Sequence, residues 1–249
     1  MLVLAIIFGL ILGSFYSVLI SRLNKKGGIL IGRSECPKCQ ERLAWHDLVP
    51  LLSYLVLKGH CRHCKKKISP LYPIVELTTA FAFVLFFLKR GLPIDIFTGY
   101  DFFLLLIFIP IIFFDYRYFI IPDKIVLPAI VVSLVFAIFF RQPEIVSLLT
   151  SGLLLGGFFA ILYIVSSGKW LGLGDAKLLL LIGVSFGYPS AFLITVFSVW
   201  TATFIGLALM IFRRATLKSA LPFGLFLAFF SIIFIIFRNE IQIFKYLFS

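Results

Sequence analysis

The chain has 249 residues, of which 61% are hydrophobic and only 14% are charged, with a formal net charge of +12. Soluble domains carry about 25% charged residues, and no soluble core of this size can bury so much apolar surface. The composition therefore excludes a large soluble domain and predicts an all-α polytopic membrane protein.

Apolar runs predict about eight transmembrane helices. The predicted spans are 2–20, 73–88, 102–114, 125–140, 145–165, 176–188, 190–212 and 220–237. Two of them, 102–114 and 176–188, are short for a bilayer crossing. Small residues at four-residue spacing predict close helix packing, although glycine is also generally common in membrane helices. These sets are Gly152 with Gly156, Gly183 with Gly187, and Ser198 with Ala202 and Gly206. No internal repeat is evident.

The first predicted span has no basic residues before it and no small-residue cleavage site. We therefore expect an uncleaved anchor with its N-terminus outside. In this orientation 18 of the Lys and Arg residues lie inside and 5 outside. The positive-inside rule favours this orientation over the inverted one.

Residues 21–72 form a long loop with eleven basic and three acidic residues, a net charge of +8. Such a stretch often binds nucleic acid, but the flanking spans favour the cytoplasmic side and anionic lipid headgroups as the partner. We expect no nucleic-acid partner. The ten apolar residues 48–57 are too few to cross a bilayer, so they either lie on the membrane surface or pack under the cysteine motifs.

The four cysteines of the chain all lie in this basic loop. They form two CxxC pairs, Cys36 with Cys39 and Cys61 with Cys64. Thiolates at this spacing suit a tetrahedral structural Zn²⁺ site, which has no open position for chemistry. A cytoplasmic loop is reducing, so metal ligation is favoured over disulfides. A redox dithiol is the alternative, but one CxxC pair would suffice for it.

Two aspartates lie at the edges of apolar runs. Asp115 ends the run 102–114, and Asp175 follows Gly172-Leu173-Gly174. Two spans separate them, so both lie at the cytoplasmic face. An ionisable group at this depth is costly and indicates a functional site. Two close carboxyls share a proton, which supplies the general base and the general acid for cutting a peptide bond with water.

Other roles for the acids remain open. Asp115 can pair with a nearby cation, and an aspartate in a transporter can relay protons or bind cations. Asp123 is a second candidate for the pair, but it follows Pro122 and also suits the start of a helix. The cations near Asp115 in this topology are Arg117, Lys124 and Lys177.

Over nearly its whole length the chain resembles the type IV prepilin peptidase family, the leader peptidases and N-methyltransferases. The resemblance rests on many motifs in order. They are Gly13-Ser14-Phe15 with Arg22-Leu23, the two cysteine pairs, Leu43-Ala44-Trp45, Pro50-Leu51-Leu52-Ser53-Tyr54-Leu55, Ile68-Ser69, Tyr72-Pro73-Ile74-Val75-Glu76, Asp115 with Ile121-Pro122-Asp123, Gly172-Leu173-Gly174-Asp175-Ala176-Lys177-Leu178, and Pro222-Phe223-Gly224.

The resemblance implies that Asp115 and Asp175 are catalytic and act at the cytoplasmic face of the bacterial inner membrane. The substrates would be prepilins or pseudopilins, cut after a glycine that precedes an apolar helix. The new N-terminus would then be methylated with S-adenosylmethionine as donor. The resemblance also implies the domain division: 1–20 as the first transmembrane helix, 21–72 as the cysteine loop, and 73–249 as the membrane-embedded peptidase core.

The cysteine loop is the family feature associated with methyl transfer, and Glu76 and Gly59 match family positions for that site. Glu76 is also placed to act simply as an acid at a helix N-terminus. Two departures fall in this half: Ser17 stands where the family has asparagine, and Leu48-Val49 stands where asparagine and isoleucine are frequent. Cleavage without methyl transfer is therefore one alternative. A non-enzymatic proton-linked transporter or scaffold is another.

Overall fold

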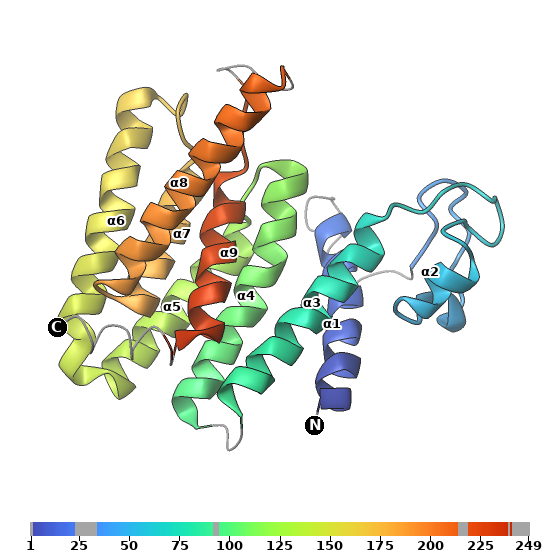
Figure 1. Ribbon diagram of the computed structural model, residues 1–249, viewed down its shortest axis with the longest axis horizontal. Coiled ribbons are helices and arrows are strands. Elements are labelled where there is room, and N and C mark those ends of the chain that lie inside the picture. Colours follow the sequence, from blue (N-terminus) through green and yellow to red (C-terminus); the bar gives the residue numbers. More distant parts are fainter. Residues whose placement is uncertain (1, 23–33, 92–94, 214–218, 239, 241–249) are drawn as a thin grey trace. The chain divides into compact units, whose positions relative to one another are not determined.

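The computed structural model describes residues 2–22, 34–91, 95–213, 219–238 and 240. Part of the predicted basic loop, 23–33, lies outside the described residues. Helices dominate the described part, in the order α1 (Leu2–Arg22), η1 (Trp45–Leu48), α2 (Leu52–Val56), α3 (Leu71–Arg90), α4 (Ile96–Tyr118), α5 (Asp123–Phe140), η2 (Gln142–Glu144), α6 (Ile145–Ser166), α7 (Leu173–Phe186), α8 (Ser190–Ile211) and α9 (Phe223–Ile236). The predicted all-α class is confirmed (Figure 1).

The chain forms two compact units, Met1–Asp95 and Ile96–Ser249. In the first, α1 packs along α3, and a lobe of residues 34–70 carries the cysteines. We call it the cysteine lobe. The packing of α1 on α3 is close: a Cβ on Gly13 would lie 2.6 Å from the Cα of Glu76. The predicted boundary at residue 73 assigns α3 to the peptidase core, and it stays a prediction. In the structure α3 belongs to the N-terminal compact unit.

In the second unit α7 is the central helix, because it packs against α5, α6, α8 and α9. Its neighbour α6 approaches very closely where two glycines meet. A Cβ built on Gly183 would lie only 2.3 Å from the Cα of Gly152, and one on Gly156 would lie 2.9 Å from the Cβ of Leu180. The small-residue packing predicted for Gly152, Gly156 and Gly183 is therefore confirmed, as expected where no hydrophobic effect drives helices together.

The eight longer helices coincide with the eight predicted spans, but they do not all have the length of a bilayer crossing. Six described helices are long and apolar enough to span: α1, α3, α4, α5, α6 together with η2, and α8. The helices α7 and α9 have 14 residues each, about 21 Å, which is shorter than the hydrocarbon core. Both are largely buried by neighbouring helices, so their ends need not reach both lipid surfaces.

The helix α4 corrects the short prediction 102–114, because it runs for 23 residues from Ile96. The sequence prediction stopped at Asp101, where a charge interrupts the apolar run. In the structure Asp101 is fully buried and its Oδ1 atom accepts a hydrogen bond from Arg238 Nη1 at 2.6 Å. The ion pair compensates the charge, so the helix continues through it.

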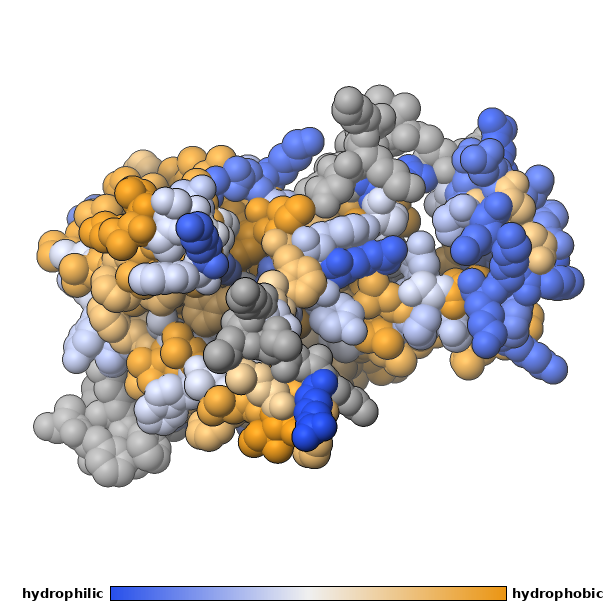
Figure 2. Space-filling view, turned by 90° about the horizontal axis from the view of Figure 1, so that it is seen from above, coloured by the Kyte–Doolittle hydropathy of each residue, from blue (hydrophilic) through white to orange (hydrophobic). Residues whose placement is uncertain are grey.

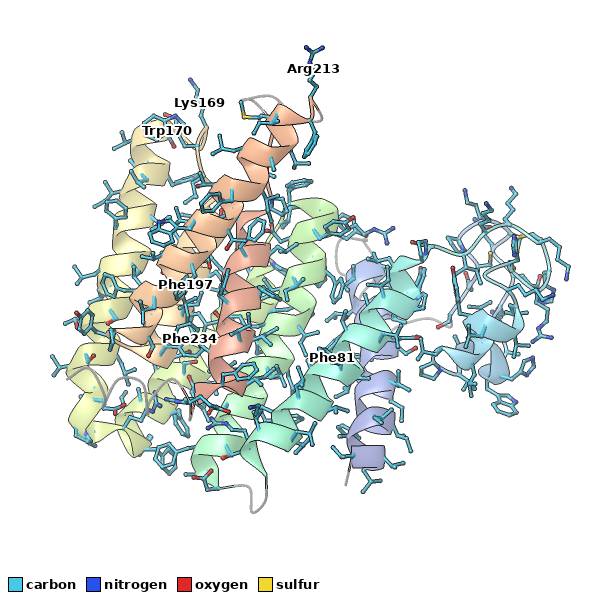
Figure 3. The ribbon with its side chains drawn as sticks, viewed as in Figure 1. Phe81, Lys169, Trp170, Phe197, Arg213 and Phe234 are labelled. Atoms are coloured by element: carbon cyan, nitrogen blue, oxygen red, sulfur yellow. The ribbon has the colours of Figure 1, made fainter. Side chains whose placement is uncertain are left out.

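Apolar and polar residues separate along the chain as expected for a membrane protein. Figure 2 shows orange apolar residues over the helices and blue hydrophilic residues gathered over the cysteine lobe. Within the second unit, Figure 3 places Lys169, Trp170 and Arg213 at one end. Tryptophan and basic residues mark the membrane interface, with basic residues favouring the inside. This is the end at which α7 begins.

Candidate active site and metal centre

Asp115 lies in the last turn of α4, and its side chain is bound by the start of another helix. Its Oδ2 atom accepts a hydrogen bond of 2.8 Å from the backbone N–H of Leu225, in the first turn of α9. The residue is only 4% exposed. Unpaired N–H groups and the helix dipole make a helix N-terminus a good partner for an anion. The start of α9 therefore compensates a carboxylate buried at the end of α4.

Asp175 lies in the first turn of α7, three residues after Gly172. Its Oδ2 atom accepts a longer hydrogen bond of 3.3 Å from the Gly172 N–H. This is half of a capping box, since glycine has no side chain to return the bond. The charge of Asp115 acts directly on Asp175. The structure thus brings the two predicted acids, which are 60 residues apart in the sequence, near enough for the charge of one to affect the other.

Ile121 fills the space between the starts of α7 and α9. A Cβ on Gly174 would lie 3.0 Å from the Cβ of Ile121, and a Cβ on Gly224 would lie 2.7 Å from its Cδ1. The Gly224 position would also be 3.1 Å from Oδ2 of Asp115. The two glycines therefore allow both helix starts to close on Ile121 and on the carboxyl of Asp115.

Two of the three cations that lie near Asp115 in the predicted topology have other partners. Lys177 Nζ donates to Asp123 at 2.8 Å, which joins α7 to the start of α5. The guanidinium of Arg117 lies over the ring of its neighbour Tyr118, 5.4 Å from the centroid. Asp123 therefore has a cationic partner, and Asp115 has the start of α9 instead.

The four cysteines come together in the cysteine lobe. Their sulfur atoms all lie within 4.8 Å of one another, and Cys36 Sγ lies 4.0 Å from Cys64 Sγ. A tetrahedral zinc with bonds of about 2.3 Å places its sulfurs about 3.8 Å apart, so the cluster fits this ion. Cys36 and Cys61 are buried, whereas Cys39 is exposed.

The two cysteine pairs have the same backbone structure with an offset of 25 residues. The N–H of Cys36 donates to Glu41 O, and that of Cys61 donates to Lys66 O. One residue after the second cysteine of each pair, Gln40 and Lys65 both have φ near +60°. This local repeat was not evident in the sequence, because beyond the cysteines the equivalent side chains differ. Each pair is a knuckle that turns two sulfurs to one side.

Backbone hydrogen bonds prepare the knuckles for a cation. Burial raises the pKa of the Cys36 thiol, but hydrogen bonds from the backbone of Cys39 and Lys38 and from neighbouring thiols outweigh it and lower the pKa to about 7. A hydrogen bond from the Glu41 backbone lowers the pKa of Cys39, but burial and the other thiols raise it to about 11. Four thiolates repel one another, so full ionisation requires a metal ion.

An ion pair between Asp47 and the half-exposed Arg62 joins the second knuckle to η1. Burial raises the pKa of Asp47, but the hydrogen bond and the charge of Arg62 outweigh it and keep the pKa below its ordinary value. Arg62 Nε lies 2.9 Å from Asp47 Oδ1. Arg62 stands between Cys61 and Cys64, so this pair ties the second cysteine pair to Asp47 in η1.

The two residues predicted for methyl transfer have defined surroundings. The buried carboxyl of Glu76 accepts a hydrogen bond of 2.8 Å from the Leu51 N–H and interacts with the Ser14 side chain. Gly59 has φ +70°, in the left-handed region, and packs under the Tyr54 hydroxyl. Their part in binding a methyl donor stays a prediction.

The fold and the site define a class: a multi-pass membrane protein with two neighbouring acids at one end of its second unit and a cluster of four cysteines that could hold a metal ion. A family model described as the bacterial peptidase A24 N-terminal domain matches residues 7–90, and the type IV leader peptidase family model matches residues 102–207. The first match covers the cysteines, and the second covers Asp115 and Asp175.

Several relatives are similar over most of the chain. A prepilin leader peptidase/N-methyltransferase of Bacillus subtilis is 33% identical, over 90% of this chain and 89% of its own. Proteins with the same description from Vibrio cholerae and Klebsiella pneumoniae are 36% and 35% identical, over 78% and 83% of their own lengths. The chain belongs to the prepilin leader peptidase family. No solved structure was found to match it.

Sequence reasoning missed the part played by the start of α9. In the sequence, Pro222-Phe223-Gly224 indicates only the resemblance to the family. Proline at the start of an apolar run is a signal for a helix N-terminus, and an N-terminus can bind an anion. The sequence could not say that the anion is Asp115, 110 residues earlier.

Proposed function

We propose that this protein cleaves the leader peptide of type IV prepilins or pseudopilins, with Asp115 and Asp175 as the catalytic pair. The observation that carries the proposal is that both acids border Ile121: it lies against Gly174, directly before Asp175, and against Gly224, whose Cβ position would be 3.1 Å from Asp115 Oδ2. Membership in the prepilin leader peptidase family supports it. It also disfavours the transporter and scaffold alternatives, because their functions do not require this family's motifs.

The hydrogen bonds suggest which acid has which role. A short hydrogen bond from Leu225 favours the charged form of Asp115, since bonds to a carboxylate stabilise its charge. Asp115 would then take the proton from the attacking water. Among the described residues, Asp175 accepts only the longer bond from Gly172, so it would hold the shared proton and deliver it to the carbonyl oxygen of the scissile peptide.

Two substitutions test this assignment. Asp115→Asn and Asp175→Asn keep the size of the side chain and an acceptor oxygen but cannot exchange the proton. Each should lower the cleavage rate of a prepilin in a reconstituted assay by about 10²-fold or more. Asp123→Asn is the matched control, because Asp123 pairs with Lys177, and it should retain activity. Near-normal cleavage by Asp115→Asn or by Asp175→Asn would contradict the assignment of the two acids as the catalytic pair.

We infer further that the cysteine lobe serves methyl transfer to the new N-terminus, with S-adenosylmethionine as donor. The relatives' description as N-methyltransferases supports this. Cys36, Cys39, Cys61 and Cys64 would hold a zinc ion, which stabilises the lobe and takes no part in the reaction. Labelled S-adenosylmethionine should mark the cleaved substrate. Cleavage without label would leave a peptidase alone.

The proposed location is the inner membrane, with the acids facing the cytoplasm. The basic residues and Trp170 at the end where α7 begins support this orientation through the positive-inside rule (Figure 3). The basic loop would hold anionic headgroups, and the apolar helix of the substrate would enter from the lipid. In intact cells, Lys169→Cys should not react with a membrane-impermeant thiol reagent. It should react with the same reagent once the cytoplasmic side of the membrane is accessible.

A further inference from the structure

The cysteine lobe exposes a group of large apolar side chains. We call it the α2 patch, and it consists of Trp45, Leu48, Leu52, Leu55 and Val56. Their exposed fractions run from 41% for Leu48 to 80% for Trp45. On α2 the three members stand at positions i, i+3 and i+4, so they share one helix face. A patch of this kind on a polar lobe indicates a surface that something apolar covers.

A hydrogen bond fixes the level of this patch along the membrane helix α3. Leu51, directly before α2, donates its N–H to Glu76, the sixth residue of α3. At 1.5 Å per residue, Glu76 lies about 7.5 Å from the start of this span. The patch therefore begins beside the first turns of a helix that crosses the membrane, not beyond its end.

The surroundings of α3 at this level are apolar. Ile74 and Leu77, on either side of Glu76 in the chain, are 46% and 53% exposed. A spanning helix exposes such side chains to lipid. Leu51 has φ +59°, a strained conformation for leucine, and it holds its N–H toward the buried carboxyl. The lobe is thus fastened at the depth at which α3 begins to expose apolar side chains.

The lobe has a second, hydrophilic side. Seen from above in Figure 2, blue residues cover it, whereas α2 lies on its lower side in Figure 1. Lys65, Lys66 and Lys67 are exposed. The bridge between His60 and Lys67 is only a few residues from the start of α3, so the short connection keeps the lobe close to that helix end. One polar and one apolar side, at this depth, is the pattern of an interfacial segment.

We propose that the α2 patch inserts into the interfacial layer of the bilayer, so that the cysteine lobe lies flat on the membrane. The occupant of the patch is lipid: acyl chains against Leu52, Leu55 and Val56, and the headgroup boundary against Trp45, whose ring suits that layer. The zinc centre then sits just above the headgroups. This inference concerns the lobe alone and does not require the proposed catalytic pair.

Quenching of tryptophan fluorescence tests the insertion. The chain has three tryptophans, so Trp170→Phe with Trp200→Phe leaves Trp45 as the only one. The full-length protein is reconstituted into phosphatidylcholine–phosphatidylglycerol vesicles whose lipids are brominated either near the headgroup or near the acyl-chain end. We expect shallow bromine to quench Trp45 at least about twofold more than deep bromine does.

Trp200 provides the matched control. It is 60% exposed near the middle of the spanning helix α8, so a protein that keeps only Trp200 should be quenched more by the deep bromine. A double substitution, Leu55→Glu with Val56→Glu, should abolish the quenching of Trp45. One zinc ion per chain in that variant shows that the lobe has folded. Lys66→Gln, at an exposed position outside the α2 patch, should leave the quenching unchanged.

Several outcomes overturn the proposal. Trp45 that is unquenched and emits as in water means that the patch faces solvent. A blue shift that appears only when a prepilin peptide is added in detergent makes the patch a substrate surface. A shift that grows with protein concentration, without quenching, makes it a contact between two copies. Quenching that persists in the folded double-glutamate variant would also contradict lipid insertion.

Discussion

Asp115 near the end of α4 accepts a hydrogen bond from Leu225 at the start of α9, and Asp101 near the start of α4 pairs with Arg238, two residues after the end of α9. The two acids are 14 residues apart on α4, about 21 Å, and their partners are 13 residues apart, along α9 and the two residues that follow it. The lengths match because the helices run antiparallel. The two contacts therefore fix the register of α9 on α4, and with it the environment of Asp115.

Replacing Gly224 should disturb Asp115 without unfolding the protein. In Gly224→Ala the new Cβ would lie 3.1 Å from Asp115 Oδ2 and 2.7 Å from Ile121 Cδ1, so the carboxyl or the start of α9 must move. We expect kcat for prepilin cleavage to fall about tenfold or more, because small displacements of a catalytic group are costly. Gly157→Ala is the control, since a Cβ there meets nothing within 4 Å. Equal activity of the two variants would contradict the contact at Gly224.

Breaking the buried pair of Asp101 and Arg238 should destabilise the second unit. Asp101→Asn leaves Arg238, whose side chain is 18% exposed, without its charge partner. Removing one member of a buried pair costs about 3–5 kcal/mol in the free energy of unfolding. Lys177→Gln breaks the more exposed pair with Asp123 and should cost about 1 kcal/mol or less. Denaturant unfolding in detergent measures both.

A charge reversal distinguishes the contribution of the ion pair from the effect of placing any polar side chain at these two positions. The double variant Asp101→Arg with Arg238→Asp restores opposite charges, so it should recover part of the stability that Asp101→Arg alone loses. If the double variant is no more stable than the single one, the ion pair does not set the register of α9.

Enlarging Gly183 should separate α6 from α7. The Cβ of Gly183→Ala would lie 2.3 Å from the Cα of Gly152, a backbone atom that cannot turn aside. We expect a loss of about 1–3 kcal/mol in the free energy of unfolding, because the helices must move apart. Gly157→Ala, on the same pair of helices but in open space, should be neutral or slightly stabilising. Melting temperatures of the two variants, compared in one detergent, decide the question.

Removing the metal should affect the cysteine lobe and spare the acid pair. A strong chelator, or Cys61→Ser, should unfold the lobe, because metal binding supplies much of the folding free energy of small sites. We expect methyl transfer to be lost while the rate of prepilin cleavage changes by about twofold or less, since Asp115 and Asp175 lie in the other unit. Protease digestion of the lobe reports its unfolding. Cleavage that stops together with methyl transfer would show that the two functions depend on one metal.

The sequence located most of the helices because hydropathy is a property of each segment alone. It placed α5, α6 and α8 within a few residues, and it found both cysteine pairs from their spacing. It also put Asp115 and Asp175 at one face, since an even number of crossings separates them. The sequence predicts too short a helix for α4, because a single charged residue such as Asp101 indicates the end of an apolar run unless its partner is known.

The tertiary structure alone decided which groups meet. Leu225 lies 110 residues from Asp115, and Arg238 lies 137 residues from Asp101, and no local pattern encodes such pairings. It also showed that α7, a short helix, is central, and that its glycine face lies against α6. The length and polarity of a segment are properties of consecutive residues, so the sequence determines them. The partner of a buried charge depends on which other helix packs beside it, and only the tertiary structure determines that.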